Sequence, residues 1–370
     1  MSKLSEAEIK PEDQKKLLGV GYDPKENQRS ASYSVQNHRE TRSRSHSRGI
    51  EILAVERALN TYPELGRSHF WKLIDPDKDD YTRSVAKAQP VGYFIRVKKG
   101  HQAILPLQAC FFIKEERFKQ EVHNLIVMEP DSSLNIINGC ASSDTVTAGT
   151  HIGVTEIYLK ENARLSYTMI HDWSDEVEVR PRTAISVEKN GSFISNYISI
   201  KKSKITQTFP TCYLKGKNSS GVFNSLIFAP ENSVYDIGAK VILEGNGSRA
   251  EVISRTISDG GKVIARGELV GKKQNIRAHL ECSGMLLKKS GSIQAIPVLE
   301  ACHPDVDMSH EASVGKIAEE EIYYLMSRGI SEEKAISLIV RGFLDTKILG
   351  LPAHLENEVE KTIDLLDNAF

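Results

Sequence analysis

The sequence predicts a mostly β protein whose core is a β-helix solenoid with helical segments at both ends. Turn residues recur along its middle with one even spacing, or with twice that spacing, at Asn162, Asn190, Asn218, Asn232, Asn246 and Gly260. The phrases that follow these turns, such as NGSFISNYISI and NSVYDIGAKVIL, alternate apolar and polar residues, as strands with one buried face do. Such a fixed repeat favours stacked coils over a β-sandwich, whose loops would be less evenly spaced.

Residues 1–90 are expected to form a mainly helical region. The segment RETRSRSHSRGIEILAVERALN places apolar residues at roughly helical spacing, from Ile50 to Leu59. Its front part, residues 38–48, is basic and rich in serine, which would suit contact with phosphate groups or nucleic acid. No aromatic residues for base stacking lie among these cations, so a solvated surface segment is the favoured interpretation.

The β-helix core is expected over residues 91–310, followed by a helical domain over residues 311–370. VGKIAEEEIYYLMSRG predicts a helix that stops at Gly329, and Ser331 is expected to cap a second helix. A third helix is expected at about 353–368. A DNA-binding helix-turn-helix is disfavoured because the second helix carries few cations.

The composition is that of an ordinary globular protein. Of 370 residues, 40% are hydrophobic and 26% are charged, and the net charge of −1 exerts no general attraction on nucleic acid or anionic membranes. The first residues contain no apolar signal region, and no run of about 18 apolar residues suggests a membrane span. We therefore expect a cytoplasmic protein that binds neither nucleic acid nor membrane.

The chain has five scattered cysteines, Cys110, Cys140, Cys212, Cys282 and Cys302. No two of them form a CxxC pair, which disfavours a local zinc knuckle, and a reducing cytosol disfavours disulfides. From the residues alone, Cys110 and Cys212 are interpreted as small core residues, and Cys302 stays unassigned.

Potential metal ligands concentrate in LEACHPDVDMSHEASVGKI, residues 299–317. Cysteine, histidine and carboxylate side chains there are all competent ligands, although a loop or surface role would account for them as well. His310 and Glu311 are adjacent, so in a regular strand their side chains would face opposite sides. Both could serve one site at a bend, or if they faced two different subunits.

Five sequence motifs occur in this order along the chain: INGCAS, YTMIHDW, FPTCYLKGKNSSGVFNSL, RAHLECSGMLL and SHEASVGKI. Together, over about residues 95–350, they resemble the SufB/SufD family of the SUF iron–sulfur cluster assembly machinery. The resemblance implies a right-handed parallel β-helix with helical ends. It also implies pairing as a homodimer or as a SufB/SufD-type heterodimer, and C-terminal helices that dock an ABC-type ATPase, SufC.

The resemblance assigns roles to six residues. Cys282 matches the cysteine implicated in cluster assembly, His310 an interface histidine and Glu311 an acidic ligand candidate, so these three are the expected metal ligands. Thiolate sulfur is the natural ligand of iron in such a cluster.

The other three residues are expected to handle sulfur. Cys140 matches the cysteine proposed to receive persulfide sulfur from a donor protein, and Trp173 matches a tryptophan along an internal sulfur path. His171 stands where SufB has glutamine. The implied path carries sulfur from Cys140 to Cys282 inside the helix.

The leading hypothesis is therefore a non-enzymatic scaffold subunit that builds a nascent cluster at a dimer interface, driven by a partner ATPase. The chain lacks GxxxxGK[ST] and is not expected to be the ATPase itself. The chain departs from SufB at Asn138, where Glu is usual, and VLEACHPDVDMSH is closer to SufD. The resemblance as a whole is closer to SufB, as a single ancestral-type member that forms a homodimer, because SufD normally lacks the equivalent of Cys282. A SufD-like structural partner is the alternative, and a β-helix carbohydrate-active enzyme is a weaker one. No motif decides whether reduced flavin binds.

Overall fold

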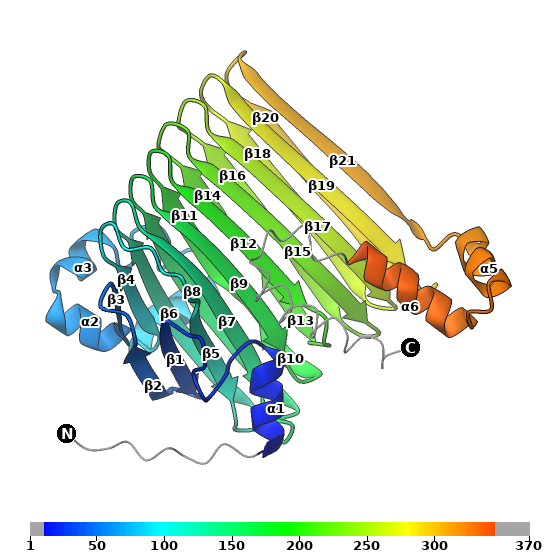
Figure 1. The fold of residues 1–370 in the computed structure, drawn as a ribbon, viewed down its shortest axis with the longest axis horizontal. Coiled ribbons are helices and arrows are strands. Elements are labelled where there is room, and N and C mark those ends of the chain that lie inside the picture. Colours follow the sequence, from blue (N-terminus) through cyan, green and yellow to red (C-terminus); the bar gives the residue numbers. More distant parts are fainter. Residues whose placement is uncertain (1–10, 345–370) are drawn as a thin grey trace.

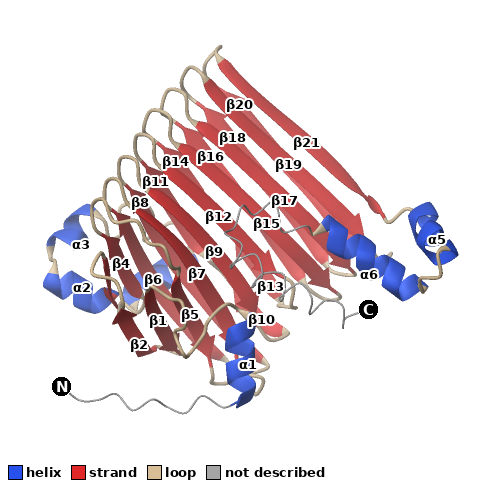
Figure 2. Ribbon diagram, in the orientation of Figure 1, coloured by secondary structure: helices blue, strands red, loops and turns tan. Residues whose placement is uncertain are grey.

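The computed structural model describes residues 11–344, which form a parallel β-helix of about eight turns built from two long sheets (Figures 1 and 2). In spatial order, the strands of the first sheet are β2 (Arg39–Ser45), β1 (Ala31–Gln36), β5 (Leu107–Ile113), β7 (Ser133–Ser142), β9 (Arg164–Asp172), β12 (Ser192–Ser199), β15 (Ser220–Pro230), β17 (Arg249–Asp259), β19 (Ile276–Leu286) and β21 (Val306–Lys316). The predicted solenoid is confirmed.

The second sheet faces the first across the core and contributes the other strand of each coil. Its strands are β3 (Ile50–Ala54), β4 (Tyr93–Val97), β6 (Phe118–Met128), β8 (Ala148–Leu159), β10 (Glu176–Val179), β11 (Arg182–Val187), β13 (Ile205–Thr208), β14 (Thr211–Leu214), β16 (Val234–Leu243), β18 (Lys262–Gly271) and β20 (Ser292–Ala301). The helices of the described residues are α1 (Pro11–Gly19), α2 (Val55–Thr61), α3 (Glu64–Ser68), α4 (Asp80–Lys87), α5 (Glu319–Ser327) and α6 (Glu332–Phe343). None of these helices has the length and apolar character needed to cross a bilayer.

The sequence repeat is explained by the length of one coil. Paired residues of β9, β12 and β15 are 28 positions apart, as Arg164, Ser192 and Ser220 are. The shorter spacing between turn residues is therefore half a coil, the distance from a turn at one edge of the solenoid to a turn at the other. Asn190 takes a left-handed backbone conformation with a φ of 55°, which asparagine tolerates well, and its side-chain amide donates to Asn162 at 3.0 Å.

Alternating side chains fill the interior of the solenoid. Along β16, buried residues alternate with half-buried ones, and Ile237, Val241 and Leu243 are at most 1% exposed. Such alternation sends every second side chain into the space between the sheets. The core is thus a continuous column, and a residue's parity within its strand determines whether its side chain faces this interior or the outside.

The N-terminal region differs from the helical prediction. It holds β1, β2 and β3 beside four short helices, so strands begin well before residue 91. The segment 50–54, predicted as helix, is strand β3, in which Ile50 and Ile52 are buried and β4 pairs antiparallel. Its short apolar run fits both the helical and the strand period, and it forms a strand because it pairs with β4 at the end of the solenoid.

The basic serine-rich stretch forms the edge strand β2 of the first sheet. Ser43 and Ser45 donate to the backbone carbonyls of Ile52 and Ile50, which joins β2 to β3 across the open end of the solenoid. Charged side chains on an edge strand discourage pairing with another sheet. The basic character of this stretch therefore has a structural reason.

The C-terminal part follows the prediction with shifted limits. Strand β21 continues to Lys316, past the expected boundary at 310, and α5 and α6 follow. Ser331 does occupy the N-cap position of α6, but its side chain makes no capping bond. The backbone carbonyl of Phe343 accepts a hydrogen bond from Arg255 at 3.3 Å, which ties α6 to the first sheet. The third helix, predicted at 353–368, lies outside the described residues.

Candidate functional site

A row of side chains runs along the interior of the first sheet and ends at Cys282. Register pairs Asn138 with Met169, Met169 with Tyr197, Tyr197 with Ser225, Ser225 with Ser254 and Ser254 with Cys282. Paired side chains of parallel strands point to the same side of the sheet, so all six face the core. We call these six residues the interior row. It spans five strand spacings, or about 24 Å.

Cys140 lies beside the first residue of the interior row, with its thiol turned inward and 1% exposed. The side-chain amide of Asn138 donates to Sγ of Cys140 at 3.2 Å, and its Oδ1 accepts from the Tyr93 hydroxyl at 3.3 Å. The hydroxyls of Tyr93 and Tyr167 are 3.0 Å apart. Burial raises the pKa of Cys140 well above its usual value, and the bond from Asn138 opposes that rise.

His171 and Trp173 complete the surroundings of this thiol. His171 pairs with Cys140 in register, its Nδ1 lies 3.0 Å from the Tyr197 hydroxyl, and its Nε2 has no hydrogen-bond partner among the described residues. Burial, reinforced by the neighbouring His151, lowers the pKa of His171 to about 3, so the ring is neutral. The Trp173 ring lies 5.8 Å from that of His171 and 5.1 Å from that of His151. The three residues expected to handle sulfur therefore form one buried cluster.

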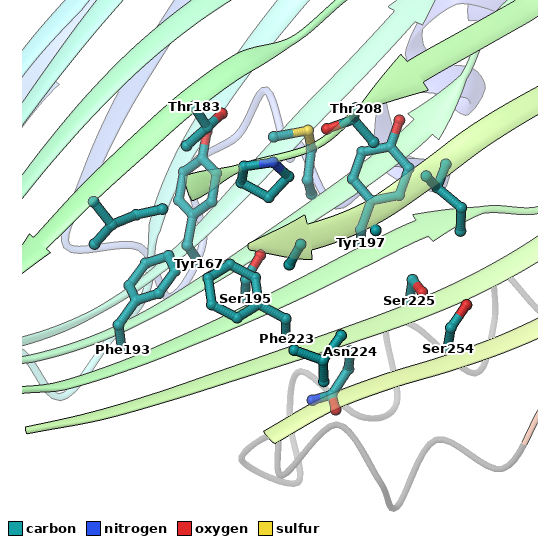
Figure 3. A pocket seen from close by; sticks show the side chains of 17 residues that line it. Tyr167, Thr183, Phe193, Ser195, Tyr197, Thr208, Phe223, Asn224, Ser225 and Ser254 are labelled. Carbon is teal, nitrogen blue, oxygen red and sulfur yellow. The ribbon is translucent and has the colours of Figure 1, made fainter. Parts of the chain in front are cut away.

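A small internal cavity lies along the interior row. Its volume is about 40 Å³, which exceeds the space that one water molecule needs. Figure 3 shows Tyr197, Ser225 and Ser254 around it, together with Tyr167 and Ser195 from the same sheet. The hydroxyl of Ser254 is buried and has no hydrogen-bond partner among the described residues. The cavity thus offers hydroxyl groups as polar contacts inside the solenoid.

Cys282 stands at the far end of the row, on the last strand but one of the first sheet. On the edge strand β21, His310 pairs with Leu280, and Glu311 pairs with Glu281. His310 therefore lies on the interior side with Leu280 and Cys282, whereas Glu311 lies on the outer side. The sequence expectation that these two neighbours face opposite sides agrees with this register.

Cys282 is 3% exposed, and the first sheet ends one strand beyond it, at the edge strand β21. Burial and the charge of Glu281 raise the pKa of this thiol to about 11, although His310 and Glu311 on β21 are exposed. Among residues 11–344, no group of three or more His, Cys, Asp or Glu side chains is placed to hold a metal ion. One chain therefore brings Cys282, His310 and Glu311 to one end of the fold without assembling them into a complete ligand set.

The remaining cysteines are dispersed. Cys212 is buried inside the solenoid on β14, as a core residue should be, and Cys110 is buried on the outer side of the first sheet beneath α1. Cys302 is exposed at the turn before β21, with its Sγ 3.5 Å from a carboxylate oxygen of Glu300. Sequence reasoning missed Ser225 and Ser254 of the interior row. Counting one regular coil back from Cys282 reaches Ser254, but the next coil is one residue longer, so Ser225 is identified only by its pairing with Ser254.

Comparison with known proteins gives the family of this solenoid. The sequence model described as "SUF system FeS cluster assembly, SufBD core domain" matches residues 111–343. The chain belongs to the SufBD family. An Archaeoglobus fulgidus protein named "Iron-sulfur cluster assembly SufBD family protein" is 46% identical over 355 residues, covering 96% of this chain and 95% of that protein.

More distant SufBD proteins match over most of the chain as well. A protein of the same name from Methanothermobacter thermautotrophicus is 44% identical, covering 97% of this chain and 88% of its own length. A Staphylococcus saprophyticus relative is 32% identical, covering 85% of this chain and 68% of its own length. These names combine SufB and SufD, so they support cluster assembly as the family's field without distinguishing the two members.

Proposed function

We propose that this SufBD protein is a scaffold subunit of the SUF machinery, on which a nascent iron–sulfur cluster is built. The relatives are named for cluster assembly, and the observation that carries the proposal is the interior row. It starts beside one buried thiol, Cys140, and ends at a second, Cys282, one strand from the edge of the first sheet. The chain acts as a platform rather than as an enzyme with a substrate of its own.

Cys140 is the proposed entry point for sulfur. Its thiolate attacks the outer sulfur of a donor protein's persulfide, so that Cys140 gains the persulfide and the donor leaves as a thiolate. The amide of Asn138, which already donates to Sγ, stabilises the negative charge that develops there. Trp173 and His171 offer two further nitrogen atoms without partners among the described residues in the same cluster.

Sulfur then has to cover the length of the interior row. About 24 Å is far beyond the reach of one persulfide exchange, because an S–S bond is about 2 Å long. We propose that a thiol reductant releases the outer sulfur as hydrogen sulfide, with oxidation of two thiols to a disulfide. Hydrogen sulfide then passes the hydroxyls of Tyr197, Ser225 and Ser254 on its way to Cys282.

Cluster assembly is proposed at the end formed by β20 and β21. The edge exposes Val298, Leu299 and Val314, which are 45%, 38% and 44% exposed. Burying these side chains against a second SufBD chain would be favourable, either as a homodimer or as a SufB/SufD-type heterodimer. Thiolate from Cys282, imidazole from His310 and carboxylate from Glu311 could then be contributed by two chains, which the opposite orientations of His310 and Glu311 would suit.

The C-terminal helices are proposed to dock a SufC-type ABC ATPase. Tyr323 and Tyr324 on α5 are 62% and 59% exposed, and Leu338 on α6 is 51% exposed. Exposed aromatic and apolar side chains on adjacent helices are typical of a protein-binding surface. ATP hydrolysis by the partner would supply the conformational work that this chain cannot.

The test is anaerobic reconstitution of the complex with its ATPase partner, followed by iron, sulfide and absorption measurements. Cys282→Ser is compared with Cys212→Ser, because both thiols are buried inside the same solenoid. A coloured wild type and Cys212→Ser with a colourless Cys282→Ser is the expected result. If the wild type takes up neither iron nor sulfide, the scaffold role fails and a SufD-like structural role replaces it.

A further inference from the structure

A second cavity lies on the outer side of the first sheet, between α1 and the β1–β2 hairpin, and is separated from the interior row by the sheet itself. Its volume is about 480 Å³, within the range of sites that hold small organic ligands. The floor is apolar and aromatic, with Leu17, Tyr22 and Phe112 packed in one cluster and Cys110 among them. Figure 1 shows α1 near the strands β1 and β5 that carry part of this floor.

A β-bulge in the hairpin places arginines on the outer side. Val35 of β1 pairs with Glu40, whereas the preceding Ser34 pairs with Arg42, so Thr41 is the extra residue of β2. The Thr41 hydroxyl donates to the backbone carbonyl of Ser34 and also lies 2.7 Å from the Ser34 hydroxyl. One extra residue shifts the alternation of a strand and re-aims the side chains that follow.

The consequence is that three arginines share the cavity's side of the hairpin. Arg39, Arg42 and Arg44 pair with Gln36, Ser34 and Ser32, which alternate with the interior residues of β1. Without the bulge, Arg39 would lie on the opposite side from the other two. All three line the cavity.

The cavity also has an excess of positive charge. Lys114 and Arg57 line it beside the three arginines, against the carboxylates of Asp13, Glu26 and Glu40 in and next to the wall.

The carboxylates are already engaged by these cations. Glu26 lies 3.3 Å from Nε of Arg42 and 3.8 Å from Arg44. Glu40 lies 2.9 Å from Arg57, and Asp13 lies 3.8 Å from Lys114. Five cations against three carboxylates leave a net positive charge in and around the cavity, which an anionic ligand would balance.

We propose that this cavity binds a small organic phosphate. The phosphate sits against the guanidinium groups of Arg39, Arg42 and Arg44, whose planar donors match phosphate oxygens. The carbon body of the ligand lies over Phe112 and Tyr22. Phosphate binding in this cavity does not depend on cluster assembly, so the two proposals are tested independently.

The test is a fluorescence titration of the full chain with 4-methylumbelliferyl phosphate and with 4-methylumbelliferone, which lacks the phosphate. We expect saturable binding of the ester and at least tenfold weaker binding of the alcohol, with inorganic phosphate competing against the ester. The double variant Arg39→Gln/Arg44→Gln is expected to weaken ester binding at least tenfold. Both arginines are exposed, so the fold is expected to survive, as the melting temperature would show.

The matched control is Arg249→Gln/Arg277→Gln, which removes two exposed arginines from the outer side of β17 and β19. Ester binding equal to that of the wild type is expected in this control. The proposal is overturned if the wild type shows no saturable binding at millimolar ester. It is also overturned if the two double variants lose affinity equally, because the cavity would then add nothing to general charge attraction.

Discussion

Ser254 and Cys282 occupy paired positions on β17 and β19, and both side chains face the interior of the solenoid. Ser254 is 3% exposed, lines the internal cavity, and is thus the last cavity residue before the thiol. A path that ends at Cys282 along this row must pass Ser254. A substitution at Ser254 therefore tests directly whether hydrogen sulfide reaches Cys282 along the interior row.

Ser254→Leu is expected to block sulfide incorporation while leaving the solenoid folded. The larger side chain fills part of a cavity of about 40 Å³, and overpacking is expected to cost about 1–3 kcal/mol of unfolding free energy. Sulfide per chain after reconstitution, with sulfur supplied only by a persulfide donor, is the measurement. Ser254→Ala is the control, because the hydroxyl has no partner among the described residues and its loss opens the path further. Normal sulfide content in Ser254→Leu would show that sulfur reaches Cys282 by another route.

The repeat made the solenoid predictable, but the interior row depends on register. Stepping back from Cys282 by the length of one regular coil reaches Ser254, and the same step leads from Tyr197 to Met169. Between Ser225 and Ser254, however, the coil is longer by a single residue. Such an extra residue in a turn exchanges the interior and outer sides of every following position, so spacing alone cannot assign the row without the pairing.

The N-terminal region could not be predicted in the same way. Ile50, Ile52 and Leu53 fit a helical period as well as a strand period, and β3 exists because β4 offers a pairing edge. The bulge at Thr41 is equally a property of pairing between β1 and β2. By contrast, adjacency alone correctly placed His310 and Glu311 on opposite sides of their strand.

His171→Gln is expected to flatten the acid dependence of stability. The folded protein holds His171 neutral because burial lowers its pKa to about 3, whereas the unfolded chain takes up a proton near the ordinary pKa of 6.5. The free energy of unfolding should therefore fall as the pH drops from 6.5 towards 3. Each such histidine contributes a slope of up to about 1.4 kcal/mol per pH unit in this window.

Urea unfolding of wild type and variant across that pH window measures the difference. Glutamine can still accept from the Tyr197 hydroxyl, so little is lost near neutral pH. His151, whose pKa burial also lowers to about 3, keeps part of the slope in the variant. If the free energy of unfolding had the same pH slope in both proteins, His171 would take up a proton in the folded state as readily as in the unfolded chain.

Asn138→Leu is expected to slow persulfide formation at Cys140. The hydrogen bond from the Asn138 side-chain amide to Sγ of Cys140, at 3.2 Å, favours the thiolate, which burial otherwise disfavours. A hydrogen bond to a charged group contributes about 1.5–3 kcal/mol, so a reduction of about 10- to 100-fold in rate follows. Mass spectrometry of the chain at fixed times after mixing with a persulfide donor gives the rate.

The variant leaves the rest of the site largely intact. Leucine has the same branching and the same number of side-chain heavy atoms as asparagine, and the Tyr93 hydroxyl keeps Tyr167 as a partner. Asn124→Leu is a suitable control because its side chain is also buried but bonds to Thr155 and the Tyr93 backbone and not to sulfur. An equal loss of rate in both variants would point to a general packing defect instead of thiolate stabilisation.

Asn190→Ala is expected to destabilise the solenoid more than Asn190→Gly. Asn190 has a φ of 55°, where alanine is disfavoured by about 1–2 kcal/mol and glycine is not. Both variants lose the side-chain bond to Asn162 equally. The difference between them is therefore the backbone strain of alanine less the extra unfolded-state entropy of glycine, which is about 0.5–1 kcal/mol. Chemical unfolding of the two proteins in parallel measures that difference. Equal stabilities would mean that the turn relaxes to a negative φ, which would disturb the stacking of asparagines along this edge of the solenoid.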